Sequence, residues 1–99
     1  LRLTGSPVVA INRAVAIGEL RGPRAALEAL DAVAADPRLA EYQPYWAGRA
    51  GMLARAGDRA AAAAAYERAI GLEADPAVRR FLQKRHQIVT QSSGGTRPG

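Results

Sequence analysis

The fold is decided by a stretch that begins Arg13-Ala14-Val15-Ala16-Ile17 and returns about 36 positions later as Arg49-Ala50-Gly51-Met52-Leu53. The same offset matches further small and large apolar residues: Ala26 with Ala62, Leu30 with Tyr66, and Val33 with Ala69. A repeat of this length indicates helix pairs that stack, because one pair cannot bury its own apolar face. We therefore expect an all-α chain in which antiparallel helical hairpins stack on one another.

Glycine, proline and aspartate divide the first half of the chain into helices. A first helix should begin at Pro7 after Ser6 as its cap, contain the apolar run over residues 8–20 and stop at Gly22. Pro23 should open a second helix over residues 24–35. Asp36-Pro37 breaks the second helix, and a connector over residues 37–43 follows. The first two helices are therefore expected to form a hairpin.

The second half repeats this punctuation. A third helix should run from Pro44 to a stop at Gly57, and Asp58 should cap a fourth. Asp75-Pro76 should begin a fifth helix that caps the stack at its C-terminal end. Its apolar residues are expected to form one stripe: Val78, Phe81, Leu82, Ile88 and Val89. The aromatic residues expected to be largely buried are Trp46, Tyr66 and Phe81.

Three segments follow from this division. Residues 7–89 should form the repeat domain, and residues 1–6 should be the end of a missing upstream segment. Residues 90–99 contain nothing to bury, so they are expected to be a disordered tail.

Composition excludes several classes of protein. The chain has no cysteine, so it can form neither a disulfide framework nor a thiolate metal site, and a cytoplasmic location is expected. No stretch approaches the roughly 20 apolar residues of a membrane span, and the N-terminus lacks a signal-peptide pattern. We therefore expect no contact with a membrane.

Catalytic and cofactor chemistry is not expected either. The single histidine, His86, has no second histidine or carboxylate cluster at ligand spacing, so it is interpreted as solvated or partly packed. Hydroxyl side chains are nearly confined to the two ends of the chain, which leaves no serine-histidine-acid triad. The sequence therefore predicts a scaffold that binds something, with no enzyme activity, no metal and no cofactor.

The second hairpin resembles a tetratricopeptide repeat. It has that family's order of aromatic, small, large, turn, small, aromatic and small residues: Trp46, Ala50, Leu53, Gly57-Asp58, Ala62, Tyr66 and Ala69. The resemblance implies stacked hairpins whose first helices line a concave groove. The groove residues would then be Ile11, Val15, Gly18 and Glu19, followed by Ala47, Gly51, Ala54 and Arg55.

A second resemblance covers nearly the whole chain. The phrase Ser6-Pro7-Val8-Val9-Ala10-Ile11-Asn12-Arg13-Ala14-Val15-Ala16 is similar to the C-terminal extension of a group of extracytoplasmic-function RNA polymerase sigma factors. Gly22-Pro23, residues 34–39 and residues 75–82 fit the same extension. The resemblance implies a regulatory or protein-interaction domain in transcription initiation, whose partners are the upstream sigma domains in the same full-length chain. RNA polymerase would be reached through those domains, and a separate regulatory protein is a further possible partner.

Two other features leave alternatives open. Arg79, Arg80, Lys84 and Arg85 form a basic patch that is either the polar outer face of a capping helix or a contact for phosphates or an acidic polymerase surface. The capping interpretation is favoured, and no specific DNA binding is expected of this fragment.

Arg13 and Arg49 occupy equivalent positions and should either reach out of the stack or pair with Asp31 and Glu67.

The alternative interpretation of the whole chain is a stand-alone tetratricopeptide adaptor module of an unrelated bacterial protein.

Overall fold

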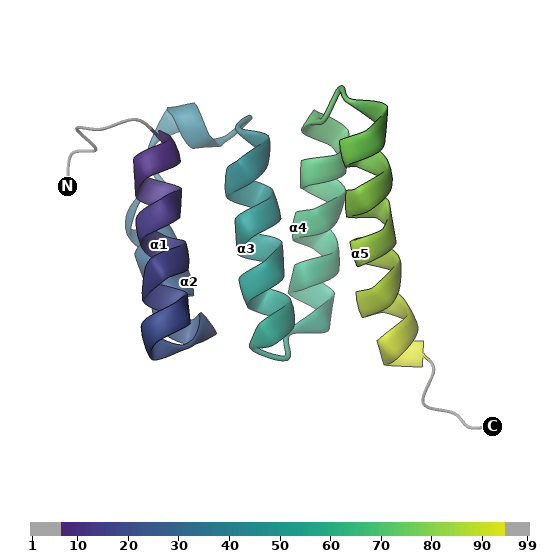
Figure 1. Cartoon of the computed structure of the whole chain (residues 1–99), viewed down its shortest axis with the longest axis horizontal. Helices are drawn as coiled ribbons and strands as arrows, with labels where there is room; N and C mark the ends of the chain where they lie inside the picture. The colour runs from purple at the N-terminus through teal and green to yellow at the C-terminus, as the bar shows by residue number, and fades with distance from the viewer. Residues whose placement is uncertain (1–6, 95–99) are drawn as a thin grey trace.

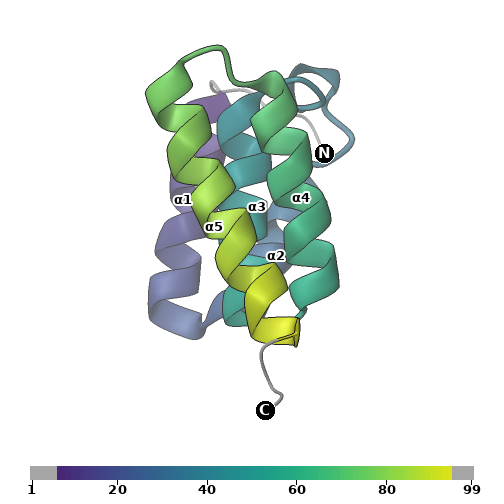
Figure 2. The ribbon, with the colours of Figure 1, turned by 90° about the vertical axis from the view of Figure 1, so that its right-hand side faces the viewer.

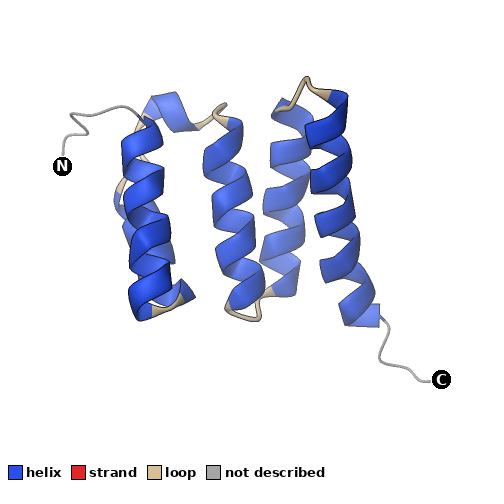
Figure 3. Ribbon diagram, viewed as in Figure 1, coloured by secondary structure: helices blue, strands red, loops and turns tan. Residues whose placement is uncertain are grey.

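The chain forms five α-helices and one 3-10 turn over residues 7–94, which are the residues that this computed structural model describes. The elements are α1 (Pro7–Arg21), α2 (Pro23–Ala32), η1 (Pro37–Leu39), α3 (Gln43–Arg55), α4 (Arg59–Leu72) and α5 (Pro76–Gly94). Within these residues there is no strand (Figure 3), so the expected all-α class is confirmed.

Each helix runs antiparallel to the one before it (Figure 1). α1 packs on α2 and α3 on α4, so the chain contains two hairpins, and α3 also contacts both helices of the first hairpin. α5 packs on α4 at the far end of the row, as Figure 2 shows from that end. The result is a layer that extends 51 × 32 × 19 Å.

The turn inside each hairpin depends on a glycine. Gly22 between α1 and α2 has a φ of 97°, and Gly57 between α3 and α4 has a φ of 90°. Residues with a Cβ atom rarely adopt this left-handed region, whereas glycine adopts it without steric cost. Asp58 then caps α4 by accepting a hydrogen bond of 3.2 Å from the Ala61 amide, and Asp75 accepts one of 2.9 Å from the Ala77 amide at the start of α5. The predicted turns and caps are thus confirmed.

The repeat in the sequence is also a repeat in burial. Three pairs of residues separated by the same offset are each at most 4% exposed: Ala14 and Ala50, Ala26 and Ala62, and Leu30 and Tyr66. The alanines allow close approach of the helices, and the larger residues fill the space between them. Equivalent positions are therefore buried in the same way in both hairpins.

Trp46 connects two hydrophobic clusters. The first cluster contains Ile11, Ala14, Leu30, Leu39 and Tyr45, the second contains residues of α3, α4 and α5, and the partly buried Trp46 ring packs against both. Its indole Nε1 donates a hydrogen bond of 3.0 Å to the Ala40 carbonyl, and the Arg68 guanidinium lies 5.3 Å from the ring centroid. Arg68 donates to the same carbonyl at 2.8 Å, so the connector is fastened to both α3 and α4.

Two expectations about helix ends were wrong. α2 ends at Ala32 instead of residue 35, because the Val33 amide already bonds to the Leu30 carbonyl in a tighter turn before Pro37. α5 continues to Gly94, so residues 90–94 belong to the helix and not to a disordered tail. Thr90 suits this position because its hydroxyl donates to the helix carbonyls of His86 and Gln87. Residues 95–99, and the proposed upstream end at residues 1–6, lie outside the described residues.

The burial expected for the aromatic residues holds in part. Tyr66 is 4% exposed, as predicted, whereas Phe81 is 59% exposed, so its expected burial was wrong. Leu82 and Val89 provide the buried face of α5 instead. A rotation of one residue is about 100° on a helix, which separates Phe81 from its neighbour Leu82.

Candidate interaction surfaces

The predicted groove residues do not all lie on an accessible surface. α1 and α3 pack so closely that Ile11 is buried in the first cluster. A Cβ atom added to Gly48 would lie 3.7 Å from the Ile11 Cγ2 atom. A Cβ atom on Gly18 would lie 3.0 Å from both the Ala26 Cβ and the Met52 Cε atoms. Ile11 and Gly18 therefore serve the contact between helices, and their assignment to a binding groove was wrong.

The remaining groove residues fall into three groups. Val15, Ala47 and Ala54 are partly buried and pack against the clusters. Glu19 and Arg55 are exposed, and their side chains form an ion pair of 3.5 Å that joins α1 to α3. A Cβ atom added to Gly51 would have no atom within 4 Å apart from its chain neighbours and the backbone of its own helix. We call Glu19, Gly51 and Arg55 the α1–α3 face.

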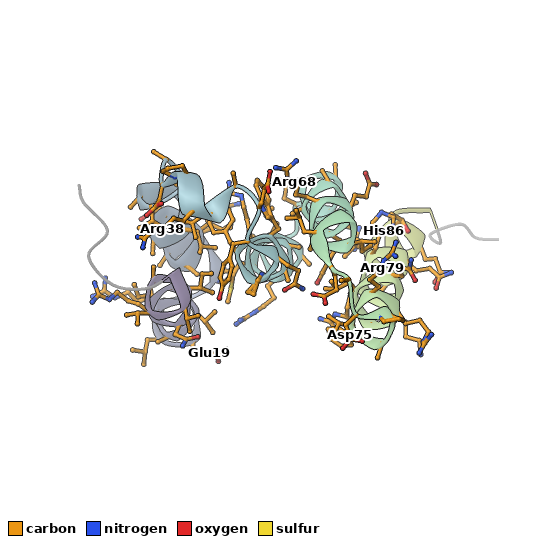
Figure 4. All side chains as sticks on the ribbon, turned by 90° about the horizontal axis from the view of Figure 1, so that it is seen from above. Glu19, Arg38, Arg68, Asp75, Arg79 and His86 are labelled. Atoms are coloured by element: carbon orange, nitrogen blue, oxygen red, sulfur yellow. The ribbon has the colours of Figure 1, made fainter. Side chains whose placement is uncertain are left out.

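The charged side chains lie on both sides of the layer. Seen from above, Glu19 lies at the lower side and Arg68 at the upper side (Figure 4). The ion pair of Glu19 with Arg55 and the contact of Arg68 with Ala40 therefore fasten opposite sides of the structure.

The basic patch lies on α5. Its four residues are exposed: Arg79, Arg80, Lys84 and Arg85. A shallow depression of about 390 Å³ is lined by Arg80, Lys84, His86 and two glutamines, Gln83 and Gln87. Its lining contains no carboxylate, so it offers positive charge and amides to a ligand.

An exposed apolar stripe on α5 was not foreseen. Val78, Phe81 and Ile88 are 36%, 59% and 52% exposed, and the Arg85 guanidinium lies 6.0 Å from the Phe81 ring centroid. We call these three apolar residues the α5 stripe. The sequence assigned them to one stripe with Leu82 and Val89, but the structure divides that set between core and surface.

Acid–base contacts join successive hairpins. Arg49 Nη1 donates to Asp31 Oδ1 at 2.7 Å, so the expectation that Arg49 pairs with an acid is confirmed, with Asp31 as its partner. Glu67 Oε2 contacts His86 Nε2 at 3.0 Å, and Arg13 is exposed. His86 is partly packed, with 26% of its side chain exposed.

Asp36 and Tyr45 have shifted pKa values. Hydrogen bonds from the Arg38 side chain and amide lower the pKa of Asp36 and stabilise the connector between α2 and α3. Burial raises the pKa of Tyr45 above 10.0, although the neighbouring Arg49 opposes this change. Both groups support local structure.

The described residues hold no group of three histidine or carboxylate side chains that could bind a metal ion. None of the helices in residues 7–94 combines the length and apolar character that a membrane crossing requires.

Comparison with known proteins found a relative of uncharacterized function. No family model matches the chain, and no solved structure matches it. An uncharacterized protein of Rhizobium meliloti (strain 1021) is 37% identical over 82 residues, which is 83% of this chain and 19% of that protein. The chain thus spans less than a fifth of the length of the curated relative that it matches.

Proposed function

We propose that this chain is a tetratricopeptide-like domain that binds protein. The observation that carries the proposal is the repeated burial of Ala14 and Ala50, Ala26 and Ala62, and Leu30 and Tyr66. Repeated hairpins of this kind create an extended surface for a partner instead of an enclosed site for a substrate. The acid–base contact of Arg49 with Asp31, followed by that of His86 with Glu67, gives the stack a repeated connection as well.

The domain acts, in this proposal, as the C-terminal regulatory extension of an extracytoplasmic-function sigma factor in transcription initiation. Support comes from the phrase over residues 6–16 and from the Gly22-Pro23 turn, which resemble that extension. The Rhizobium meliloti relative contains a similar segment within a much longer chain, as expected of one domain among several. The domain would dock on the upstream sigma domains and reach RNA polymerase through them, or bind a regulatory protein.

The α1–α3 face is the docking surface in this proposal. The open space at Gly51 permits close approach of a partner backbone, and the exposed Glu19 and Arg55 offer one charge of each sign beside it. Docking by the upstream part of the same chain is favoured over a separate protein, because two hairpins and a cap are fewer than the roughly three repeats of a free solenoid.

A matched pair of glycine substitutions tests the surface. In the full-length protein, Gly51→Leu should keep the helical circular dichroism of the parent but abolish sigma-dependent transcription in a reconstituted assay. Gly71→Leu is the control, because a Cβ atom added to Gly71 on α4 would also meet open space. Full activity of the Gly51→Leu protein would remove the α1–α3 face from the mechanism.

The coding sequence upstream of Leu1 separates the sigma-factor role from a stand-alone adaptor. Polymerase-binding and helix-turn-helix segments there would support the sigma factor. Their absence would favour an adaptor module of another bacterial protein.

A further inference from the structure

The α5 stripe runs along one side of a single helix. Val78, Phe81 and Ile88 follow at spacings of three and seven residues, which places them on one line along the helix surface. From Val78 to Ile88 the line is about 15 Å long at 1.5 Å per residue. Exposed apolar residues scattered singly need no explanation, but three in line on a helix form a surface that another helix can cover.

Positive charge accompanies this line. Lys84 and Arg85 are each three or four residues from both Phe81 and Ile88, so they are neighbours of the stripe on the helix surface. Both are exposed, and Arg85 already lies over the Phe81 ring. Arg79 and Arg80 add two more cations, and the sequence of α5 from Pro76 to Gly94 contains no aspartate or glutamate. The surface therefore has Lys84 and Arg85 beside its apolar residues, and α5 itself carries no carboxylate side chain.

The combination of an apolar stripe and neighbouring cations restricts which molecules can cover this surface. A second copy of the stripe would bring the same cations against each other, which costs free energy. Residues 1–6 and 95–99 contain arginines and no acidic side chain, so neither segment complements the charge. The stripe is narrow and is interrupted by Arg85, whereas helices that lie in a membrane surface present a broad apolar face.

We infer that the α5 stripe binds an acidic amphipathic helix of a partner protein. Apolar side chains of that helix would cover Phe81 and Ile88, and its carboxylates would pair with Lys84 and Arg85. This surface is separate from the α1–α3 face, so the inference does not depend on the proposed docking of sigma domains.

A designed peptide provides the test. The probe is a fluorescein-labelled peptide of about 14 residues, or about 21 Å of helix, with leucines at the spacing of the stripe and glutamates beside them. Fluorescence anisotropy with the whole chain should show binding in the micromolar range. Phe81→Asp and Ile88→Asp should each weaken binding by about tenfold or more, because an interface of this size depends on its few apolar anchors. Both side chains are more than half exposed, and circular dichroism checks that the variants stay folded.

Matched control variants distinguish peptide binding at the α5 stripe from non-specific binding. Leu20→Asp changes an apolar residue that is 85% exposed on α1 and should leave peptide binding unchanged. Gly51→Leu should also leave it unchanged, so failure of this inference can be told from failure of the α1–α3 face. Lys84→Glu with Arg85→Glu should weaken binding of the glutamate peptide. The same change should strengthen binding of a peptide that has lysines in place of the glutamates.

Three outcomes would overturn the inference. The first is a peptide Kd that Phe81→Asp does not change, and the second is self-association of the chain through Phe81 in sedimentation velocity. The third is stripe-dependent binding to phosphatidylserine vesicles or to duplex DNA without binding of the acidic peptide. Stripe-dependent binding of the acidic peptide alone would support it.

Discussion

Arg49 on α3 donates a 2.7 Å hydrogen bond to Asp31 on α2, and this contact crosses the boundary between the two hairpins. The next boundary carries a similar contact, in which His86 on α5 meets Glu67 on α4 at 3.0 Å. Asp31 and Glu67 are equivalent in the repeat, while His86 lies one position beyond the residue equivalent to Arg49. The residue of α5 that makes this contact is therefore offset by one position from the repeat.

A double-mutant cycle measures what the first of these contacts contributes. Asp31→Asn and Arg49→Met should show a coupling energy near the upper end of about 0.2–1 kcal/mol, because only 25% of the Arg49 side chain is exposed. Urea denaturation of the parent, both single variants and the double variant gives this value. Glu28→Gln, at an exposed position on α2, serves as the control. A coupling energy of zero would mean that the contact between Arg49 and Asp31 does not help to join the hairpins.

Tyr66→Ala should be strongly destabilising. Tyr66 is 4% exposed in the second cluster, and its truncation should cost about 3 kcal/mol or more by leaving a cavity. Phe81→Ala provides a contrast, since the exposed Phe81 ring should cost about 1 kcal/mol or less. Thermal or urea denaturation measures both, and a change below about 0.5 kcal/mol for Tyr66→Ala would contradict the alignment of the two hairpins.

The sequence predicted the helices and hairpins because their ends depend on local chemistry. Gly57 and Asp58 stop one helix and start the next through their own backbone and side chain, so no distant residue is needed to recognise them. The sequence also indicated that Arg49 pairs with an acid, but the repeat did not distinguish Asp31 on α2 from Glu67 on α4 as its partner.

The errors concern properties that depend on distant contacts. Whether Phe81 or Leu82 is buried depends on which side of α5 meets α4, and the local apolar pattern fits either choice. Likewise, Gly18 was assigned to an open groove, because the close approach of Met52 from α3 leaves no mark in the sequence around Gly18. Interaction surfaces are thus harder to predict than helices, since they are what remains exposed after the helices pack.

The two glycines of the predicted groove should respond oppositely to alanine. Gly18→Ala places a Cβ atom 3.0 Å from the Ala26 Cβ, and such overpacking typically costs about 1–3 kcal/mol. Gly51→Ala meets open space in the middle of α3 and should stabilise the protein by about 0.5–1 kcal/mol. Equal effects in urea denaturation would show that α1 does not approach α2 and α3 at Gly18 as described.

Tyr45 should make stability depend on pH in alkaline solution. Burial raises its pKa above 10.0 in the folded protein, so the unfolded chain loses this proton at a lower pH than the folded chain. Its contribution is therefore fully present below pH 10.0 and is lost as the pH rises toward the pKa of the folded state. Tyr45→Phe should flatten the decline in unfolding free energy above that pH. Ultraviolet titration should show late titration of Tyr45, and this signal should be absent from the variant.

The domain should not bind promoter DNA specifically. The basic residues of α5 can attract phosphates, but such attraction is independent of base sequence and falls steeply as salt rises. Nucleic-acid readout also needs side chains that reach base edges or stack on bases, and the exposed aromatic ring of α5, Phe81, lies under the Arg85 guanidinium.

Fluorescence anisotropy at physiological salt should therefore give equally weak binding to a promoter duplex and to its scrambled sequence. Arg79→Glu with Arg80→Glu should weaken both equally, and Arg24→Glu, at an exposed position on α2, should change them less. A sub-micromolar Kd for the promoter that the scrambled duplex does not share would move promoter recognition into this domain and replace the docking role proposed for it.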